Sequence, residues 1–234
     1  MKRITAWLVC LVLLLSCVPV TRAAEEAGRF YLTAATEQQT LIEPVAIAYT
    51  ADQTVRQALL ASQYSFEGME NGFVYAIEGT AGNYTCYYDG GGYDLDVPAS
   101  GITAIVFSEN ASGYTEGTAE LAALMGRYRE RTDHVQNYAP AKAAYEAGLK
   151  SLRGTAADAK ERKEALEKAI SDYEAILNGP KYTLTVAASQ NGQTLTQPTV
   201  TLTDAYGNET TGTGTEIRVV AGEYRFSVSD GGWN

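Results

Sequence analysis

The residues whose types could do chemistry are concentrated in one short stretch, residues 84–98. Its sequence, YTCYYDGGGYDLDVP, contains four tyrosines, three aspartates, three consecutive glycines and the only cysteine outside the first twenty-three residues. Rings that carry hydroxyl groups can stack on a sugar, and carboxylates can bind a hard cation. The candidate ligand-binding residues are Tyr87, Tyr88, Tyr93, Asp89 and Asp94.

Three interpretations of this stretch fit the residues. In the first, the glycines supply the positive φ angles of a β-hairpin turn, and the tyrosines pack across its two strands. In the second, the tyrosines form a platform for a sugar or a peptide. In the third, Asp89, Asp94 and Asp96 bind calcium, although their spacing does not match an EF-hand loop.

The rest of the chain offers no recognisable catalytic or cofactor-binding pattern. His134 is the only histidine, and neither Cys86 nor any serine lies in a nucleophile elbow of the Gly-x-Ser-x-Gly type. One histidine and one cysteine do not supply the usual ligands of a zinc site. We therefore expect neither an enzyme nor a cofactor or metal centre, and we expect Cys86 to be a small buried residue of a strand.

The first twenty-three residues have the pattern of an export signal. Lys2 and Arg3 precede an apolar run over residues 4–20, and Thr21-Arg22-Ala23 provides small residues at the first and third positions before a cleavage site. We expect residues 1–23 to be a signal peptide and the mature chain to begin at Ala24. The protein is then secreted or held at the cell surface.

Two alternatives to cleavage fit the same leader. Cys17 follows Leu14-Leu15-Ser16, which loosely resembles the lipobox of bacterial lipoproteins, so Cys17 could carry a lipid. An uncleaved apolar run of this length could also cross a bilayer. Both alternatives leave the protein outside the cell and change only how it is held there.

The charge of the chain limits its partners. Without the leader, 15 basic and 28 acidic residues leave a net charge of −13. The excess is largest in residues 30–114, where ten acidic residues and Arg56 alone give −9. Nucleic acids and anionic membrane surfaces are poor partners for such a field. We expect no nucleic-acid binding, and membrane contact only through the signal segment or a lipidated Cys17.

Residues 24–114 are predicted to form a β-rich domain that contains one helix. The runs RFYLTAAT, EPVAIAYT, GFVYAIEG and GITAIVFSE indicate strands bounded by turn residues. ADQTVRQALLASQ places Val55, Ala58, Leu59 and Ser62 on one helical face, with Asp52 available as a cap. VAIAYTADQTVRQALLAS followed by GFVYAIEG resembles the ubiquitin-like β-grasp domains of exported proteins, including those similar to the C-terminal domain of transcobalamin. The resemblance implies a β-grasp fold and a ligand-binding habit.

Residues 115–179 are predicted to form a three-helix bundle. Pro140 suits the first turn of the middle helix, Thr155 to Asp158 reads as a capping box for the last one, and Gly179 follows its end. The segment NYAPAKAAYEAGLKSLRGTAADAKERKEALEKAISDYEAIL resembles the FIVAR-type three-helix modules of Gram-positive surface proteins. The apolar positions at helical spacing are Leu121, Leu124, Met125 and Tyr128; Ala141, Tyr145, Leu149 and Leu152; and Leu166, Ala169, Ile170, Tyr173, Ile176 and Leu177.

Residues 180–234 return to a β pattern. KYTLTVAAS, PTVTLTDAYGN and TEIRVVAGEYRFSVSDGG indicate short strands joined by turns. PTVTLTDAYGN followed by AGEYRFSV is similar to the small, generally non-catalytic β-sandwich domains called PEGA or carboxypeptidase-regulatory-like. That family pattern continues with a further strand, so we expect a partial β-sandwich with an open sheet edge and a chain that is a fragment of a longer protein.

The sequence therefore predicts an α+β, multidomain protein: a β-grasp-like domain, then a three-helix bundle, then a partial small β-sandwich. Taken together, the three segments resemble a multidomain surface protein of the Gram-positive type. The expected function is non-enzymatic display, adhesion or spacing, with a cell-wall or host glycan or protein as partner. The alternative is an exported protein that binds a glycan or small ligand through its N-terminal β domain.

Overall fold

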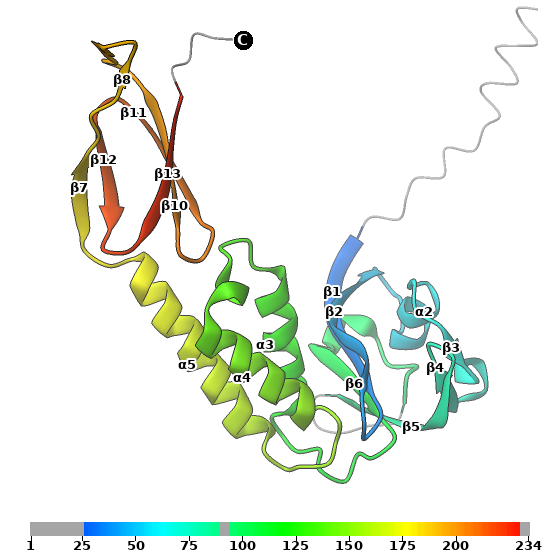
Figure 1. The fold of residues 1–234 in the computed structure, drawn as a ribbon. Coiled ribbons are helices and arrows are strands. Elements are labelled where there is room, and N and C mark those ends of the chain that lie inside the picture. Colours follow the sequence, from blue (N-terminus) through cyan, green and yellow to red (C-terminus); the bar gives the residue numbers. More distant parts are fainter. Residues whose placement is uncertain (1–25, 89–93, 230–234) are drawn as a thin grey trace, which may run out of the picture.

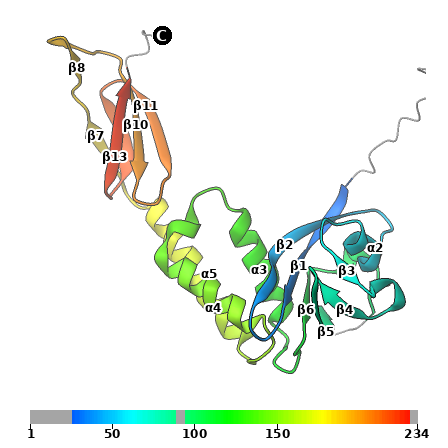
Figure 2. The same ribbon diagram turned by 45° about the vertical axis from the view of Figure 1, so that its right-hand side comes forward.

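The computed structural model describes residues 26–88 and 94–229 and shows a mixed α+β protein. A curled sheet lies at one end, three long helices lie in the middle, and a group of short strands lies at the other end (Figure 1; Figure 2). The N-terminal elements are β1 (Glu26–Ala35), β2 (Thr40–Thr50), α2 (Val55–Leu60), β3 (Phe66–Glu67), β4 (Val74–Ile77), β5 (Thr80–Tyr88) and β6 (Ala104–Ser108), with the 3-10 helices η1 (Met69–Asn71) and η2 (Ala99–Gly101).

The N-terminal sheet has six strands in the order β2-β1-β6-β5-β4-β3. β1 and β6, the first and last strands of this sheet along the chain, lie side by side inside it and run parallel, and the other neighbours are antiparallel. β1 is buried on both faces from Phe30 to Ala35. The sheet is therefore covered on both sides, so its central strands read as continuous apolar runs.

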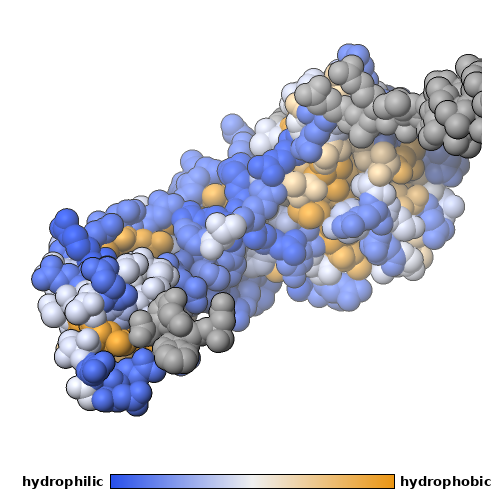
Figure 3. Space-filling model, turned by 90° about the horizontal axis from the view of Figure 1, so that it is seen from above, coloured by the Kyte–Doolittle hydropathy of each residue, from blue (hydrophilic) through white to orange (hydrophobic). Residues whose placement is uncertain are grey.

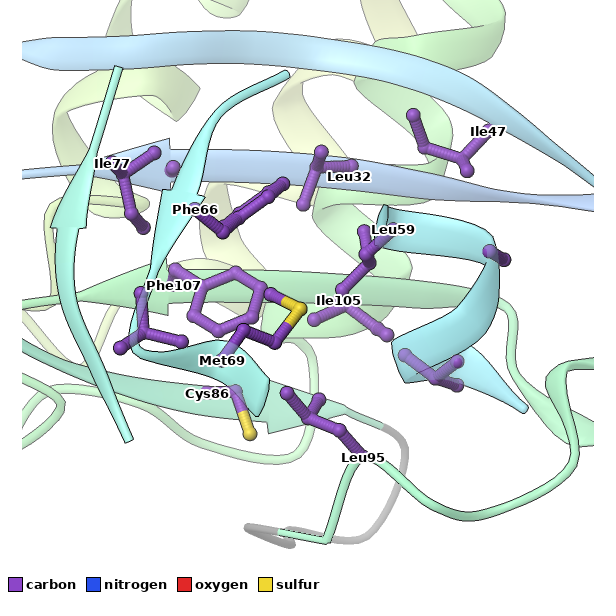
Figure 4. Close-up of a cluster of buried hydrophobic side chains, with 14 of the residues drawn as sticks. Leu32, Ile47, Leu59, Phe66, Met69, Ile77, Cys86, Leu95, Ile105 and Phe107 are labelled. Carbon is purple, nitrogen blue, oxygen red and sulfur yellow. The ribbon is translucent and has the colours of Figure 1, made fainter. Parts of the chain in front are cut away.

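One face of the sheet packs on α2 and the 3-10 helices and forms the first hydrophobic core (Figure 4). Val55, Ala58 and Leu59 are buried, as predicted, whereas Ser62 lies beyond the end of the helix and is only partly buried. The predicted cap was wrong, because Thr54 and not Asp52 begins the helix. The Thr54 hydroxyl accepts a hydrogen bond from the Gln57 backbone, and the Gln57 side chain accepts one from the Thr54 backbone.

The other face of the sheet is covered by α3 (Thr118–Glu130), which packs with α4 (Ala139–Ser151) and α5 (Ala159–Leu177). These helices share the second hydrophobic core with β1 and β6. Gly126 of α3 lies against the ring of Tyr31, and a Cβ at this position would be 2.0 Å from the ring. Glycine is thus required where the helix meets the sheet. The separation of residues 115–179 as a domain stays a prediction.

The residues predicted to begin and end the helices do so only in part. Pro140 lies in the first turn of α4, and Gly179 follows the end of α5, as expected. The predicted capping box for α5 was wrong, because Asp158 is the N-cap residue and makes no side-chain capping bond. Among the described residues, no helix has the length and apolar character needed to cross a membrane.

The C-terminal strands form two small sheets and a short hairpin. β10 lies between β11 and β13, β7 pairs with β12, and β8 pairs with β9. Their shared core is small, with Val200, Leu202 and Ile217 as its buried residues. The strands are β7 (Lys181–Thr185), β8 (Ser189–Gln190), β9 (Gln193–Thr194), β10 (Thr199–Asp204), β11 (Glu209–Thr213), β12 (Glu216–Val220) and β13 (Tyr224–Ser229).

Candidate functional site

The tyrosine-rich stretch does not form the predicted hairpin in its described part. β5 ends at Tyr88, and its partners are β4 and β6, which lie on either side of it. Residues 94–98 instead run beside the start of α2, where the Leu95 and Val97 carbonyls accept hydrogen bonds from the Arg56 and Val55 backbone. Asp89 and Tyr93, which the calcium and platform interpretations need, lie outside the described residues.

Tyr87 and Tyr88 lie on opposite faces of the sheet, as strand alternation requires. The Tyr87 ring packs edge-on against Tyr114, with ring centroids 5.5 Å apart. Tyr88 packs against the first core, and its hydroxyl donates to the Asp94 carbonyl at 3.2 Å. Both side chains are half-buried. These two rings therefore do not form one common platform.

The acidic groups of this stretch hold the loop in place. The Arg56 guanidinium donates to both carboxylate oxygens of Asp96, at 2.7 and 3.0 Å, and this hydrogen bonding lowers the pKa of Asp96. Asp94 is exposed, and its carboxylate accepts a hydrogen bond from the Asp96 backbone at 2.8 Å. Asp96 thus anchors the loop to α2, which sequence reasoning did not assign to it.

A pocket of about 280 Å³ opens beside β4 and β5. Its floor includes buried Cys86, and burial raises the pKa of this thiol to about 11. The thiol is protonated at neutral pH, so it acts there as a small apolar group. Phe73 lies at the pocket with 76% of its surface exposed. The lining residues are Gly72, Phe73, Val74, Asn83, Tyr84, Thr85, Cys86, Leu95 and Phe107.

A second group of tyrosines joins the helices to the C-terminal strands. Tyr138 precedes α4, Tyr173 lies on α5 and Tyr206 lies in the turn between β10 and β11. Their three ring centroids are 5.6, 5.9 and 5.2 Å from one another, and two of the three pairs are edge-on. We call these three residues the tyrosine junction. Aromatic pairs in such arrangements attract beyond the area that they bury.

Hydrogen bonds reinforce the tyrosine junction. The Tyr173 hydroxyl donates to the Asp133 carbonyl and accepts from the Asn208 side chain at 2.8 Å, and burial raises the pKa of Tyr173. The Asn137 side chain donates to the Tyr206 carbonyl at 2.6 Å. The polar groups at this partly buried boundary are therefore paired, which avoids the cost of leaving them unsatisfied.

The turn that carries Tyr206 is held by Asp204. One oxygen of its carboxylate accepts hydrogen bonds from the Tyr206 and Asn208 backbone at 2.8 and 2.9 Å. Gly207 has a φ of 101°, in the region that favours glycine, and lies close to the exposed His134. The sequence motif Asp204-Ala-Tyr-Gly-Asn indicated a turn, but it gave no sign that this turn meets the helices.

Two pockets flank the turn, with volumes of about 480 and 240 Å³. Both are lined by Asp204, Ala205, Tyr206, Glu223 and Tyr224, and the smaller one also reaches Ile176 and Leu177 at the end of α5. The Asp204 carboxylate is already engaged by the turn, and the Tyr224 hydroxyl donates to the Val220 carbonyl at 3.0 Å. The smaller pocket is the space between the end of α5 and the two turns, and the larger one lies between the turn and the start of β13.

Comparisons with known proteins add no relative. No family model, curated protein or solved structure matches the chain. Within the described ranges, no three His, Cys, Asp or Glu side chains come together in a group that could hold a metal ion. The arrangement of the described residues is thus the basis for a functional proposal.

Proposed function

We propose that this protein is a non-enzymatic, exported cell-surface component that acts in display, adhesion or spacing. The observation that carries the proposal is the tyrosine junction, which fastens the C-terminal strands to the helices. A flexible linker would let the terminal strands move freely, whereas a packed and hydrogen-bonded boundary holds them at a fixed position. A fixed position is what a spacing element needs.

The N-terminal sheet is also fastened to the helices. The Tyr31 hydroxyl donates to Glu130 at 2.9 Å, and the Tyr145 hydroxyl donates to Glu43 at 3.0 Å, so both bonds join the sheet to the helices. α5 has 19 residues and is about 28 Å long at 1.5 Å per residue. The helices therefore lie between the two β regions and are joined to each of them by side-chain contacts (Figure 2).

The proposal includes the three domain types expected from the sequence. A β-grasp assignment is supported by the N-terminal topology, in which the first and last strands of the sheet lie side by side and run parallel, and α2 covers one face. A three-helix bundle is supported by the mutual packing of α3, α4 and α5. A partial β-sandwich is supported by the two small sheets that share Val200, Leu202 and Ile217.

Surface exposure of the terminal strands tests the proposal. We would insert an epitope tag after Asn191, in the exposed turn between β8 and β9, and express the full chain in a Gram-positive host. We expect an antibody to label intact cells or to detect the tagged chain in the medium. A matched chain without residues 1–23 should stay inside the cell. Retention of the full-length tagged chain in the cytoplasm would refute the proposal.

A second candidate function is the binding of a glycan or small ligand by the N-terminal region. The exposed ring of Phe73 at the 280 Å³ pocket favours it, because exposed aromatic rings are common contact groups for sugars and small molecules. Phe73→Ala should abolish retention on a cell-wall preparation or glycan array and leave the melting temperature unchanged. Leu60→Ala is the matched control, since Leu60 is 51% exposed and lies outside this pocket. Equal retention of both variants would exclude Phe73 as a contact.

A further inference from the structure

The C-terminal strand β13 has apolar side chains on its inward face that nothing among the described residues covers. Residues directly opposite one another in an antiparallel pair lie on the same face of the sheet. Leu202 and Val200 of β10 are buried in the core, and their partners across the pair are Phe226 and Val228 of β13. Phe226 is nevertheless 69% exposed, and Val228 is 37% exposed. The inward face of β13 thus carries apolar side chains that the core leaves exposed to solvent.

The sheet on the other side of the core also pairs a buried apolar residue with an exposed one. Ile217 of β12 is buried, whereas its partner Leu184 on β7 is 39% exposed. Tyr182, two residues before Leu184, is 58% exposed. Figure 3 shows hydrophobic residues at the surface of this end of the molecule, on the left of the view. This region has only three buried core residues but several large apolar side chains that are exposed. Such exposed apolar side chains indicate an interaction surface.

The free edge of β13 has little of the usual protection. In the described part of the sheet, β13 pairs only with β10, in a continuous register without a bulge. It contains no proline, lysine or acidic residue, and Arg225 is its one charge. In contrast, the edge strand β2 carries Glu43 and Pro44, and the Pro44 carbonyl accepts a hydrogen bond from Arg129 at 2.9 Å. Natural sheets block open edges with such features, and β13 lacks them.

We propose that β13 pairs with β13 of a second copy of this chain, antiparallel and about a twofold axis centred on Phe226. The two Phe226 rings then lie directly opposite each other on the inward face. Tyr224 of each copy lies opposite Val228 of the other, so the whole inward row is paired with apolar side chains. On the outward face, Arg225 lies opposite Ser227 of the second copy, so no like charges meet.

This register follows from the alternation of the strand. Pairing that keeps both inward faces on one side must match inward residues with inward residues. A register centred on Ser227 also does this, but it leaves Tyr224 without a counterpart in β13. Centring on Phe226 uses all three inward side chains of the strand. The self-association does not depend on the surface role proposed above, so either can fail alone.

Sedimentation velocity on the chain from residue 24 to 234, at concentrations up to about 200 µM, tests the proposal. We expect a reversible dimer, and we expect Phe226→Lys to raise its dissociation constant at least about tenfold, because it places a charge on the inward face of the paired edge. Thr213→Lys is the matched control, since it adds the same charge at an exposed position on the opposite edge strand, β11. Thermal melts of both variants establish that the monomer stays folded.

Disulfide trapping tests the register. A mixture of Arg225→Cys and Ser227→Cys chains should form covalent heterodimers under oxidation, because directly opposite residues lie within reach of a disulfide. Each variant alone should not, because its own two cysteines then lie diagonally, beyond the roughly 7 Å that a disulfide spans. Efficient linkage of Ser227→Cys alone would refute this register. A chain that stays monomeric, or a dimer unaffected by Phe226→Lys, would refute the proposal and leave the edge for a strand from another polypeptide.

Discussion

Replacing Tyr173 with alanine should lower the free energy of unfolding by about 3–5 kcal/mol, the usual cost of removing a large buried aromatic side chain. The ring is fully buried and packs against both Tyr138 and Tyr206. Its hydroxyl also holds Asn208 and the Asp133 carbonyl. The substitution therefore leaves a cavity and removes two hydrogen bonds at the same place. Chemical denaturation followed by circular dichroism measures the loss.

Two matched variants separate the contributions at this position. Tyr173→Phe keeps the ring and removes the hydroxyl, so we expect a loss of about 1–2 kcal/mol. Tyr182→Ala removes a tyrosine that is 58% exposed, and we expect a loss below about 0.5 kcal/mol. If Tyr173→Ala lowered the free energy of unfolding no more than Tyr182→Ala does, that result would contradict the packing of the tyrosine junction.

Leu166→Ala should lower the free energy of unfolding by about 2–4 kcal/mol. Leu166 is fully buried on α5, in the core that the three helices share with β1 and β6. Ile170, one turn later, is only partly buried, so we expect Ile170→Ala to cost less than the same substitution at Leu166. The two residues were equivalent in the helical pattern, and the structure distinguishes them.

Ile176→Ala serves as the control on the same helix. Ile176 is 37% exposed, and we expect its loss to change stability by less than about 1 kcal/mol. In urea denaturation of the three variants, we expect the loss in the free energy of unfolding to be largest at Leu166, smaller at Ile170 and smallest at Ile176. A reversed order would mean that α5 is rotated relative to its neighbours.

The mixed α+β character could be predicted because it depends on local periodicity. The run RFYLTAAT became β1, and the buried positions Leu121, Met125 and Leu166 lie where helical spacing put them. The capping residues were harder to predict, since Asp52 and Thr54 are both good caps and only the backbone conformation separates them. The boundaries of the elements could therefore be predicted less well than the elements themselves.

The candidate site could be predicted only in part, because strand pairing is decided by distant residues. Residues 84–98 looked like a hairpin by their turn residues, yet β5 pairs with β6, whose position is fixed by β1. Tyr138, Tyr173 and Tyr206 come from two helical regions and a turn, and no local pattern connects them. Their meeting follows from how the chain folds back beyond α5.

The central claim, that the C-terminal strands are fastened to the helices, can be tested most directly by a distance measurement. Spin labels at Glu167→Cys on α5 and Thr213→Cys on β11 occupy exposed positions, while Cys86 is buried. Pulsed electron resonance should give one narrow distance distribution for the otherwise unchanged chain, and a broader one when Tyr206→Ala is added. A broad distribution in the unchanged chain would contradict the account, because the two regions would then move independently.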